Sequence, residues 1–420
     1  MRVLIVGGGA REHALAWKLS RSPLAEEMYA APGNPGIAAL ASCVPIRPDA
    51  VVELAEFAQS LKIDLTVVGP ELPLVLGLVD EFARRGLVVC GPSRVAAEVE
   101  GSKVFTKELC QRYGIPTAEA RVVHDREGAA AAIKQMGLPV VLKADGLAAG
   151  KGVIPCRTWA EAEEALVRFF EERVFGAAAE RVLVERYLEG EEISFMVLTD
   201  GTTILPLASA RDYKRLADGD QGPNTGGMGS VSPSPIAPAL GGAILQDILR
   251  PALAGLAKEA REYRGVLYAG VMVTSDGPKL LEFNCRLGDP ETQVVMPRLE
   301  DDLLPLLYGA ATGELAGLRV QWRHEAAVCV VCAAAGYPEA VRTGDAITGI
   351  AEALAVPGVV VFQAGTVLEE GRLVTGGGRV LSVVGRGATV SAARAQAYAA
   401  VERIHFAGMH FRSDIGRGIE

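Results

Sequence analysis

The run KADGLAAGKGV at residues 143–153 decides how the centre of this chain is organised. One apolar run ends at Lys143 and another begins at Val153, so the sequence predicts a glycine-rich loop between two strands. The run is not a P-loop, which would read GxxxxGK[ST] and lead into a helix. A loop of this kind can fold over a polyphosphate and exclude water, while Lys143 supplies a point charge. The other candidates for nucleotide binding in this loop are Gly146, Gly150, Lys151 and Gly152.

Upstream of this loop, short apolar runs alternate with helical stretches over residues 1–102. The runs RVLIVG, DLTVVGP and LVVCGP end in Gly or Pro, as buried parallel strands do. Helices are expected between them, at residues 12–19, 51–61 and 75–85. This βαβ pattern predicts an N-terminal domain with an open parallel sheet, whose ligands bind at the carboxyl ends of the strands.

The rest of the chain predicts two further regions. In the central region, residues 103–325, a helix at 103–113 leads into a small α/β lobe at about 118–188 that contains the glycine loop. Longer strands are expected in EEISFMVLTDG and TTILPLASARDYK, followed by a hairpin with the turn SDGP. Several strands with Gly-rich turns and a closing helix at 391–403 predict a mixed α/β domain at residues 326–420. The predicted fold class is multidomain, with α/β and α+β parts.

Composition excludes several classes of protein. The 420 residues carry a formal net charge of −9, whereas nucleic-acid-binding domains usually present a basic stripe. No apolar run of about 18 residues occurs, so we expect neither a membrane span nor a signal peptide. The seven cysteines are scattered, and the CxxC of Cys329 and Cys332 lies in an apolar run, so we expect neither disulfides nor zinc. These features predict a cytoplasmic protein without a nucleic-acid or membrane partner.

A second glycine-rich turn, GGGAREH at residues 7–13, follows the first predicted strand. Glu12 occupies the place of the third glycine of a dinucleotide fingerprint, and no acidic residue ends the second strand, which argues against an NAD site. The backbone N–H groups at the start of the next helix favour an anion such as a sugar phosphate. A purely structural tight turn is the alternative. Gly9 and Glu12 are the candidates here, and Glu71 lies at another strand end of the same sheet.

Three polar side chains alternate along LEFNCRLGDPE, residues 281–291. On a strand, Glu282, Asn284 and Arg286 project to one face. A carboxylate and an amide oxygen suit a hard cation such as Mg²⁺, and Arg286 can stabilise charge on a transferring phosphoryl group. A salt-bridged strand is the alternative, although three polar side chains in a buried hairpin are costly without a ligand.

Two further segments carry weaker signals. In ERYLEGEE, residues 185–192, backbone groups could meet an adenine edge and a carboxylate could meet ribose hydroxyls, although acidic turns are usually solvated. The basic strand end SARDYKR, residues 209–215, precedes the glycine-rich run GPNTGGMG, which suggests an anion site or a surface loop. The candidates for substrate binding are Gly9, Glu12, Glu71, Arg211, Asp212, Lys214 and Asp289.

In this order, the runs GGGAREHA, KADGLAAGKGV, GPNTGGMG and EFNCRLGDPETQ resemble the ATP-grasp superfamily, and within it the glycinamide ribonucleotide synthetase family, over essentially the whole chain. The resemblance implies ATP-dependent ligation of glycine to 5-phosphoribosylamine through a glycyl phosphate, in de novo purine synthesis. The products would be glycinamide ribonucleotide, ADP and phosphate. By the same resemblance, Lys103 and Lys143 contact the phosphates of ATP, and the segment from Glu185 to Leu188 contacts the adenine. Glu192 contacts the ribose, and Glu282 with Asn284 binds Mg²⁺ or Mn²⁺.

One departure concerns the metal. Many ATP-grasp proteins carry another acidic ligand on the preceding strand, but residues 268–273, YAGVMV, contain none. The number of metal ions therefore stays open. No Ser/His/Asp or Cys/His arrangement occurs, so Lys143 and Arg286 are expected to act by positioning and charge. The alternatives are a carboxylase, a formate-using purine enzyme or a non-catalytic nucleotide sensor, and we expect a monomer or a weak dimer.

Overall fold

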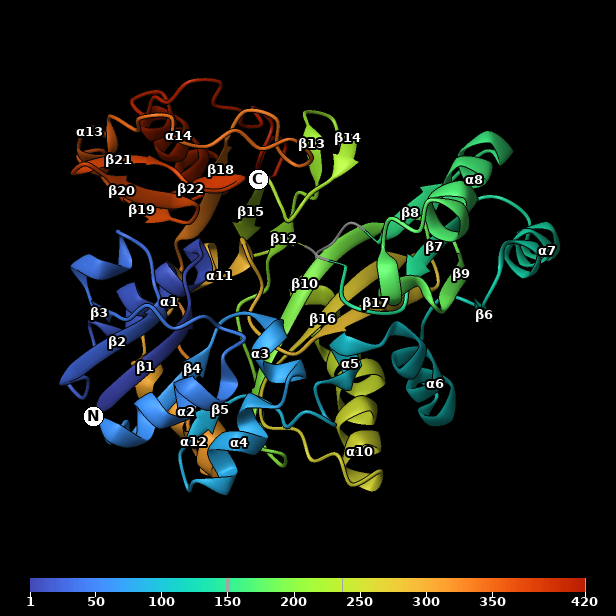
Figure 1. Ribbon diagram of the computed structural model, residues 1–420, viewed down its shortest axis with the longest axis horizontal. Coiled ribbons are helices and arrows are strands. Elements are labelled where there is room, and N and C mark those ends of the chain that lie inside the picture. The colour runs from blue at the N-terminus through green and yellow to red at the C-terminus, as the bar shows by residue number, and fades with distance from the viewer. Residues whose placement is uncertain (149–151, 236, 420) are drawn as a thin grey trace.

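The computed structural model describes residues 1–148, 152–235 and 237–419. Its N-terminal domain contains a five-stranded parallel sheet in the order β3-β2-β1-β4-β5 (Figure 1). The elements of this domain are β1 (Arg2–Gly7), α1 (Ala10–Leu19), β2 (Glu27–Pro32), β3 (Ser42–Cys43), α2 (Val51–Ser60), β4 (Leu65–Val68), α3 (Glu71–Val75), α4 (Leu78–Arg84) and β5 (Val89–Cys90). The predicted parallel sheet is confirmed. The helix expected at 75–85 is α4, which Gly77, at φ +89°, separates from α3.

The small lobe is a four-stranded antiparallel sheet in the order β6-β9-β7-β8, with two helices. The elements are α5 (Glu98–Gly101) and α6 (Lys103–Tyr113) before the lobe, then β6 (Ala120–Val123), α7 (Arg126–Met136), β7 (Val140–Ala144), β8 (Val153–Cys156), α8 (Trp159–Leu166) and β9 (Val182–Arg186). Helix α6 spans the predicted residues because Ser102 caps its start and Gly114, at φ +67°, ends it. Lys143 pairs with Val153 across β7 and β8, so the glycine loop joins two strands as predicted.

The central sheet is antiparallel, in the order β11-β10-β16-β17. Its strands, and the helices beside it, are β10 (Glu191–Thr199), β11 (Ile204–Pro206), α9 (Ala237–Ala243), α10 (Arg250–Lys258), β16 (Gly265–Thr274) and β17 (Gly277–Asn284). The single strand predicted in TTILPLASARDYK is wrong. The chain leaves β11 after Pro206 and forms only an isolated bridge between Ala210 and Ser194 before joining a different sheet. This change of register redirects the chain, as a β-bulge does.

The C-terminal sheet has the order β12-β15-β18-β22-β19, and two of its strands come from the middle of the chain. The remaining elements are β12 (Arg211–Asp212), β13 (Arg215–Ala217), β14 (Gln221–Asn224), β15 (Gly229–Ser232), α11 (Glu291–Val295), α12 (Leu303–Thr312), β18 (Ala326–Ala333), α13 (Ile350–Leu354), β19 (Val359–Gln363), β20 (Thr366–Glu369), β21 (Arg372–Thr375), β22 (Arg379–Gly387) and α14 (Val390–Val401). Cys329 and Cys332 are buried core residues of β18. The pairing of β15 with β18 holds the segment at 211–232 against the C-terminal domain.

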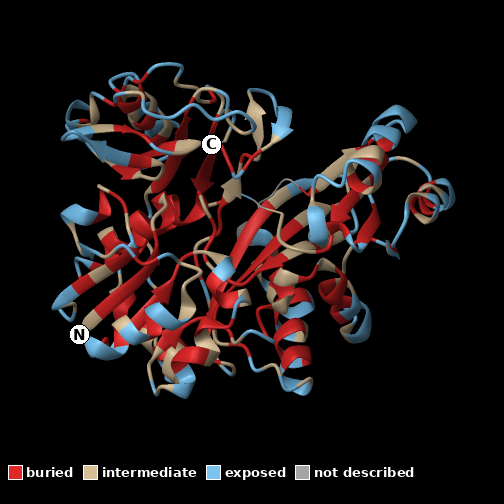
Figure 2. Ribbon diagram, in the orientation of Figure 1, coloured by how far each residue is buried: buried red, intermediate tan, exposed pale blue. Residues whose placement is uncertain are grey.

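The arrangement of these parts positions one central cleft. Figure 1 shows the small lobe projecting from strands β10, β16 and β17, while the N-terminal and C-terminal domains lie together on the other side. Buried residues follow the strands of the larger sheets, and exposed residues gather on the outer helices of the small lobe (Figure 2). Within residues 1–148, 152–235 and 237–419, no helix is long and apolar enough to cross a membrane.

Candidate active site

A cleft of about 390 Å³ lies where the small lobe, the central sheet and the two terminal domains meet. Most of the residues singled out from the sequence line its wall. They are Glu71, Lys103, Gly152, Glu185, Asp212, Lys214, Glu282, Asn284, Arg286 and Asp289. Residues that are far apart in the chain are therefore brought to one cavity.

Strand β17 supplies the oxygen ligands that suit a cation. Glu282 and Asn284 lie two residues apart and both reach the cleft, as the strand period requires. Glu282 pairs across the sheet with Gly270, where an added Cβ would lie 3.5 Å from Glu282 Cγ and 3.9 Å from Glu192 Oε1. Burial opposes ionisation, but Lys214 and Lys103 outweigh it and lower the pKa of Glu282.

Arg286 follows β17 and is held by two carboxylates. Its Nη2 lies 2.9 Å from Glu100 Oε1, and its Nε lies 3.2 Å from Glu71 Oε2. Burial disfavours the charged guanidinium, but these two carboxylates reverse the effect and raise the pKa of Arg286. The side chain is therefore a fixed cation at the end of the strand that carries Glu282 and Asn284.

Two lysines share the carboxylate of Glu185. Lys143 Nζ lies 2.9 Å and Lys107 Nζ lies 3.2 Å from Glu185 Oε2, and Lys143 also donates to Leu281 O at 3.3 Å. Glu185 thus reaches the cleft through its side chain, whereas the sequence interpretation used its backbone. Lys107 was missed, although it lies four residues after Lys103 on α6 and therefore on the same helix face.

The start of α6 is tied to the glycine loop. Asp145 Oδ1 accepts from Ser102 Oγ and from Val104 N, both at 2.8 Å, and Lys103 Nζ donates to Gly146 O at 3.4 Å. The N–H of Gly146 already donates to Ala178 O at 3.1 Å. The small lobe itself therefore uses the N–H of Gly146, and the assignment of this residue to nucleotide binding stays a prediction. Gly150 and Lys151 lie outside the described residues.

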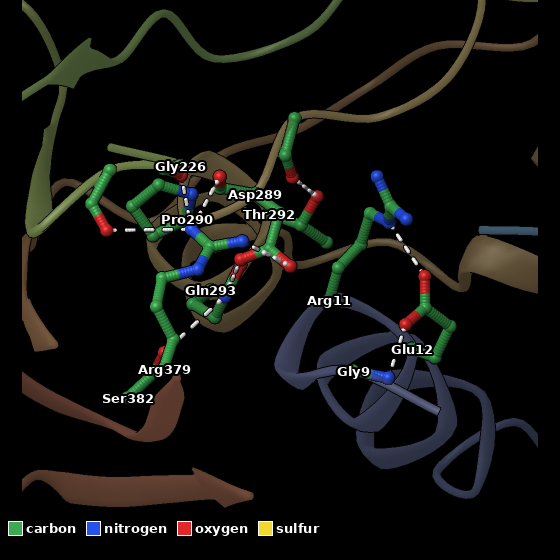
Figure 3. Close-up of polar contacts among 12 residues, drawn as sticks. Gly9, Arg11, Glu12, Gly226, Asp289, Pro290, Thr292, Gln293, Arg379 and Ser382 are labelled. Atoms are coloured by element: carbon green, nitrogen blue, oxygen red, sulfur yellow. Dashed lines mark hydrogen bonds and ion pairs between the residues drawn. The ribbon is translucent and has the colours of Figure 1, made fainter. Parts of the chain in front are cut away.

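The glycines of the N-terminal turn and Glu12 are not among the residues that line the cleft. Glu12 is only 2% exposed, and its carboxylate accepts from Gly9 N and from Arg11 Nε, each at 2.6 Å (Figure 3). The carboxylate of Glu12 therefore accepts from the N–H of Gly9, which is one of the donors at the helix start. This contact favours the tight-turn alternative, while the sugar-phosphate hypothesis for Gly9 and Glu12 stays a prediction. Arg11, which was missed, does line the cleft.

Several other predicted residues, Lys143 and Gly146 among them, lie outside the cleft wall. Leu188 does not contribute to it, and Glu192 forms an ion pair with Lys214. Arg211 turns away, with its guanidinium 5.3 Å from the ring centroid of Tyr213. Its neighbour Asp212 faces the cleft because successive side chains of a strand point to opposite sides.

The C-terminal domain completes the cleft through Arg379 of β22. This guanidinium lies 3.2 Å from Asp289 Oδ2, donates to Asp289 O at 2.9 Å and donates to Gly226 O (Figure 3). Gln293 donates to the other carboxylate oxygen of Asp289 at 2.7 Å. Although burial opposes ionisation, Arg379 outweighs it and lowers the pKa of Asp289. No sequence motif pointed to Arg379, because its role depends on the contact between two domains.

The donor set fits a magnesium ion bound mainly by other groups. In the part of the chain that the structure describes, no group of three or more His, Cys, Asp or Glu side chains could hold a metal ion. Glu282 and Asn284 supply two oxygens, and Asn284 is 8% exposed. Magnesium commonly takes one or two protein oxygens and completes its shell with phosphate and water.

Comparison with protein-family models covers almost the entire chain. The N domain of phosphoribosylglycinamide synthetase matches residues 1–100, its ATP-grasp (A) domain matches 101–292, and its C domain matches 327–418. The chain belongs to the phosphoribosylglycinamide synthetase family. The match places Lys103, Glu282 and Arg286 in the ATP-grasp domain of this family and Arg379 in its C domain.

Relatives agree with this assignment over their full lengths. The phosphoribosylamine–glycine ligase of Brucella melitensis is 49% identical, and the alignment covers 100% of this chain and 99% of the relative. That of Mesorhizobium japonicum is 51% identical, over 99% of this chain and 98% of the relative. The crystal structure of phosphoribosylamine–glycine ligase from Thermotoga maritima matches with a TM-score of 0.86 and 35% identity, over 99% of this chain and 100% of that chain.

The fold extends beyond this synthetase family. The biotin carboxylase domain of the Hydrogenobacter thermophilus 2-oxoglutarate carboxylase, solved with magnesium ADP and bicarbonate, matches with a TM-score of 0.72. The match covers 98% of this chain and 91% of that chain, at 20% identity. At that identity the likeness shows a shared fold, which confirms the predicted ATP-grasp architecture.

Proposed function

We propose that this chain ligates glycine to 5-phosphoribosylamine at the expense of ATP, through a glycyl phosphate, and releases glycinamide ribonucleotide, ADP and phosphate. One observation carries the proposal. In a chain that the synthetase family matches from end to end, the magnesium-type oxygens of β17, the lysines Lys103 and Lys107, and Arg286 line a single cleft. This combination fits one triphosphate better than it fits a structural core.

The chemistry explains why ATP is needed. A carboxylate is a poor electrophile towards an amine, because oxide is a poor leaving group. Transfer of the γ-phosphoryl group to the carboxylate oxygen of glycine creates an acyl phosphate, and attack by the amine then releases phosphate. The site must hold the reactants in line and exclude water from the acyl phosphate, which requires positioned charges rather than a protein nucleophile.

For the nucleotide, we assign cationic side chains to the phosphates and oxygen-bearing side chains to the metal ion. We assign Lys103 and Lys143 to the phosphates. Lys103 lines the cleft and forms no ion pair with any described residue, which leaves its charge available, whereas Lys143 is paired with Glu185. Arg286 can stabilise the charge of the transferring phosphoryl group. Glu282 and Asn284 would hold Mg²⁺ or Mn²⁺, which supplies charge neutralisation on the phosphate oxygens. We assign recognition of the adenine base to the segment from Glu185 to Leu188.

On the substrate side, we assign Glu71, Asp212, Lys214 and Asp289, which all line the cleft. Glu71 and Asp289 are already paired with Arg286 and Arg379, so they order these cations in the wall. Glu192, beside Lys214, is assigned to ribose recognition. The amine of phosphoribosylamine attacks in its neutral form, and the proton that it loses as the amide forms can be taken up by the released phosphate.

A coupled assay for ADP, run with each substrate omitted in turn, tests the function. The proposal expects full turnover only with ATP, a divalent metal, glycine and phosphoribosylamine together. ADP release that depends on bicarbonate or formate instead of glycine would favour a carboxylase or a formate-using enzyme. ATP binding without any product would favour a nucleotide sensor.

A further inference from the structure

An aspartate at the start of the glycine loop completes a helix in another part of the chain. The N–H of Lys103, the first residue of α6, donates to Asp145 O at 3.1 Å, and the N–H of Val104 donates to Asp145 Oδ1 at 2.8 Å. The N–H of Phe105 donates to Ser102 Oγ, which itself donates to Asp145 Oδ1. The first N–H groups of a helix have no acceptor within the helix, so Asp145 satisfies two donors that would otherwise lack a partner.

The other side of Asp145 is fixed to the small lobe. Asp145 Oδ2 lies 2.5 Å from Arg181 Nη2, and Asp145 N donates to Arg181 O at 3.1 Å. Asp145 is 7% exposed, whereas the side chain of Arg181 is 45% exposed. An ion pair that is open to water contributes little, while buried hydrogen bonds to a carboxylate are among the stronger ones. We therefore expect the contacts of Asp145 with α6 to matter more than its ion pair with Arg181.

These contacts fix the backbone that carries Lys103. The N–H of Lys103 is held by Asp145, and its Nζ donates to Gly146 O at 3.4 Å. Lys103 lines the cleft and forms no ion pair with any described residue. A lysine side chain is flexible, so a charge that no carboxylate holds stays in place only if the backbone beneath it is fixed. The position of the Lys103 charge in the cleft thus depends on Asp145.

The start of α6 differs from a helix start that binds an anionic ligand directly. Such a helix presents free N–H groups to the anion. At α6, the N–H groups of Lys103 and Val104 are already used by Asp145. The helix therefore offers the cleft the side chains of Lys103 and Lys107 instead of its backbone donors.

We propose that Asp145 is a positioning residue for ATP, which acts through Lys103 by holding the start of α6 against the glycine loop. The inference rests on the proposed function, because it takes the phosphates of ATP as the partners of Lys103. Asp145 itself is not among the described residues that line the cleft, and both of its carboxylate oxygens are used by the chain. Its effect on ATP is therefore indirect.

Binding measured by calorimetry tests this role without requiring turnover. Full-length enzyme with Mg²⁺ is titrated with the non-hydrolysable β,γ-imido analogue of ATP and, separately, with AMP, which lacks the β- and γ-phosphates. Asp145→Ala should raise the Kd for the analogue about 30-fold and the Kd for AMP less than about threefold, because the change acts on the phosphates through Lys103. In the ADP assay, the KM for ATP should rise while the KM for glycine stays unchanged.

The conservative variant Asp145→Asn separates the helix contact from the ion pair. Its amide oxygen can still accept from Ser102 and Val104, and the charge that pairs with the exposed Arg181 is lost. The Kd for the analogue should therefore stay within about threefold of that of the unaltered enzyme. Equal losses in Asp145→Asn and Asp145→Ala would overturn the proposal. If Asp145→Ala fails to fold, Asp145→Ser, which also removes the carboxylate, takes its place.

A double-mutant cycle tests whether Asp145 acts through Lys103. Lys103→Met should itself weaken binding of the analogue. Adding Asp145→Ala to Lys103→Met should then raise the Kd less than about threefold further, because the charge to be positioned is already gone. Losses that multiply would overturn the proposal, since Asp145 would then act by another route.

Asp125→Ala is the matched control for general damage to the small lobe. Asp125 Oδ1 accepts from Gly128 N at 2.7 Å and caps α7, so this variant also removes an aspartate from a helix start. It should leave the Kd for the analogue unchanged, and a rise as large as that of Asp145→Ala would overturn the proposal. Unchanged binding in Asp145→Ala would overturn it as well. Absence of glycine-dependent ADP with the unaltered enzyme would instead refute the proposed function.

Discussion

Two glycine-rich turns in this protein follow the same local pattern and have different environments. The turn at residues 7–13 and the loop at 143–153 each follow a buried strand, and both were interpreted as anion sites. At the first turn, Glu12 takes up the N–H of Gly9. At the second loop, Lys143 is the penultimate residue of β7, and Lys103 Nζ donates to Gly146 O. In the first turn, a backbone donor is used by the chain's own carboxylate. The second loop lies beside Lys103, which lines the cleft.

The difference teaches that glycines alone do not make an anion site. Glycine allows close backbone approach, but a donor helps a ligand only if no other group of the chain uses it. Even in the cleft loop, the N–H of Gly146 donates to Ala178 O. The described residues that distinguish the two turns are therefore lysines rather than backbone donors.

The largest expected effect is on catalysis, and it comes from a change in the cleft. Glu282→Ala removes one of the two oxygens assigned to the metal and should lower kcat/KM for ADP formation about 10³-fold at limiting Mg²⁺, because several kcal/mol of charge stabilisation are lost. Excess Mg²⁺ should restore part of the rate. Asp276→Asn, in the exposed turn of the same hairpin, is the control. Equal activity of Glu282→Ala and the unaltered enzyme at limiting Mg²⁺ would refute the metal assignment.

The next largest effect is on stability, and it comes from a change in the N-terminal glycine turn. Glu12→Ala removes the helix cap and leaves the buried guanidinium of Arg11 without its carboxylate, which should lower the free energy of unfolding by about 3 kcal/mol. Urea denaturation followed by circular dichroism measures the change. Glu26→Ala, whose carboxylate is exposed near the same domain's N-terminus, should cost under about 1 kcal/mol. Similar midpoints for the two variants would contradict a structural role for Glu12.

A smaller effect sharpens the role of the lysines. Lys143→Met keeps the length of the side chain but removes its charge, and should lower kcat/KM for ATP about 10²-fold. Lys134→Met, on the exposed face of α7 in the same lobe, provides the comparison and should change kcat/KM less than about twofold. If the two lysine variants change kcat/KM for ATP equally, the charge of Lys143 does not contribute to the use of ATP.

The smallest effect is the pH dependence of stability that arises from His13, in the N-terminal glycine turn. His13 Nδ1 accepts from Gln363 N at 2.8 Å, and burial lowers the pKa of His13 to about 4. The unfolded chain, with a His pKa of about 6.5, therefore binds more protons between pH 6.5 and 4, so stability is present above this window and is lost as pH falls through it. Between pH 7 and 5 the loss from this residue should be about 1–2 kcal/mol.

Urea unfolding at the two pH values measures this loss. His13→Gln cannot titrate, so its unfolding free energy should change less between pH 7 and 5 than that of the unaltered protein. His405, for which the same substitution serves as control, lies at a backbone bridge with Thr348 outside this contact. A pH dependence that His13→Gln leaves intact would assign the loss to other groups.

Local pattern predicted much of the fold and part of the cleft. Helix α6 has its predicted bounds because a capping serine and a terminal glycine are encoded beside it. Glu282, Asn284 and Arg286 share one face because alternation along a strand is a local property. The strand predicted in TTILPLASARDYK failed, since its pairing partners, β10 and β15, lie on different sheets.

The sequence by itself determined the parallel N-terminal sheet, the glycine loop between two strands and the alternating polar side chains of β17. Periodicity and capping act over a few residues, so they can be read without coordinates. Tertiary structure alone decided that Arg379 crosses from the C-terminal domain to Asp289, and that Arg286 lies between the carboxylates of Glu71 and Glu100. The physical reason is that a charge takes its role from the charges packed against it, and here the partners come from distant parts of the chain.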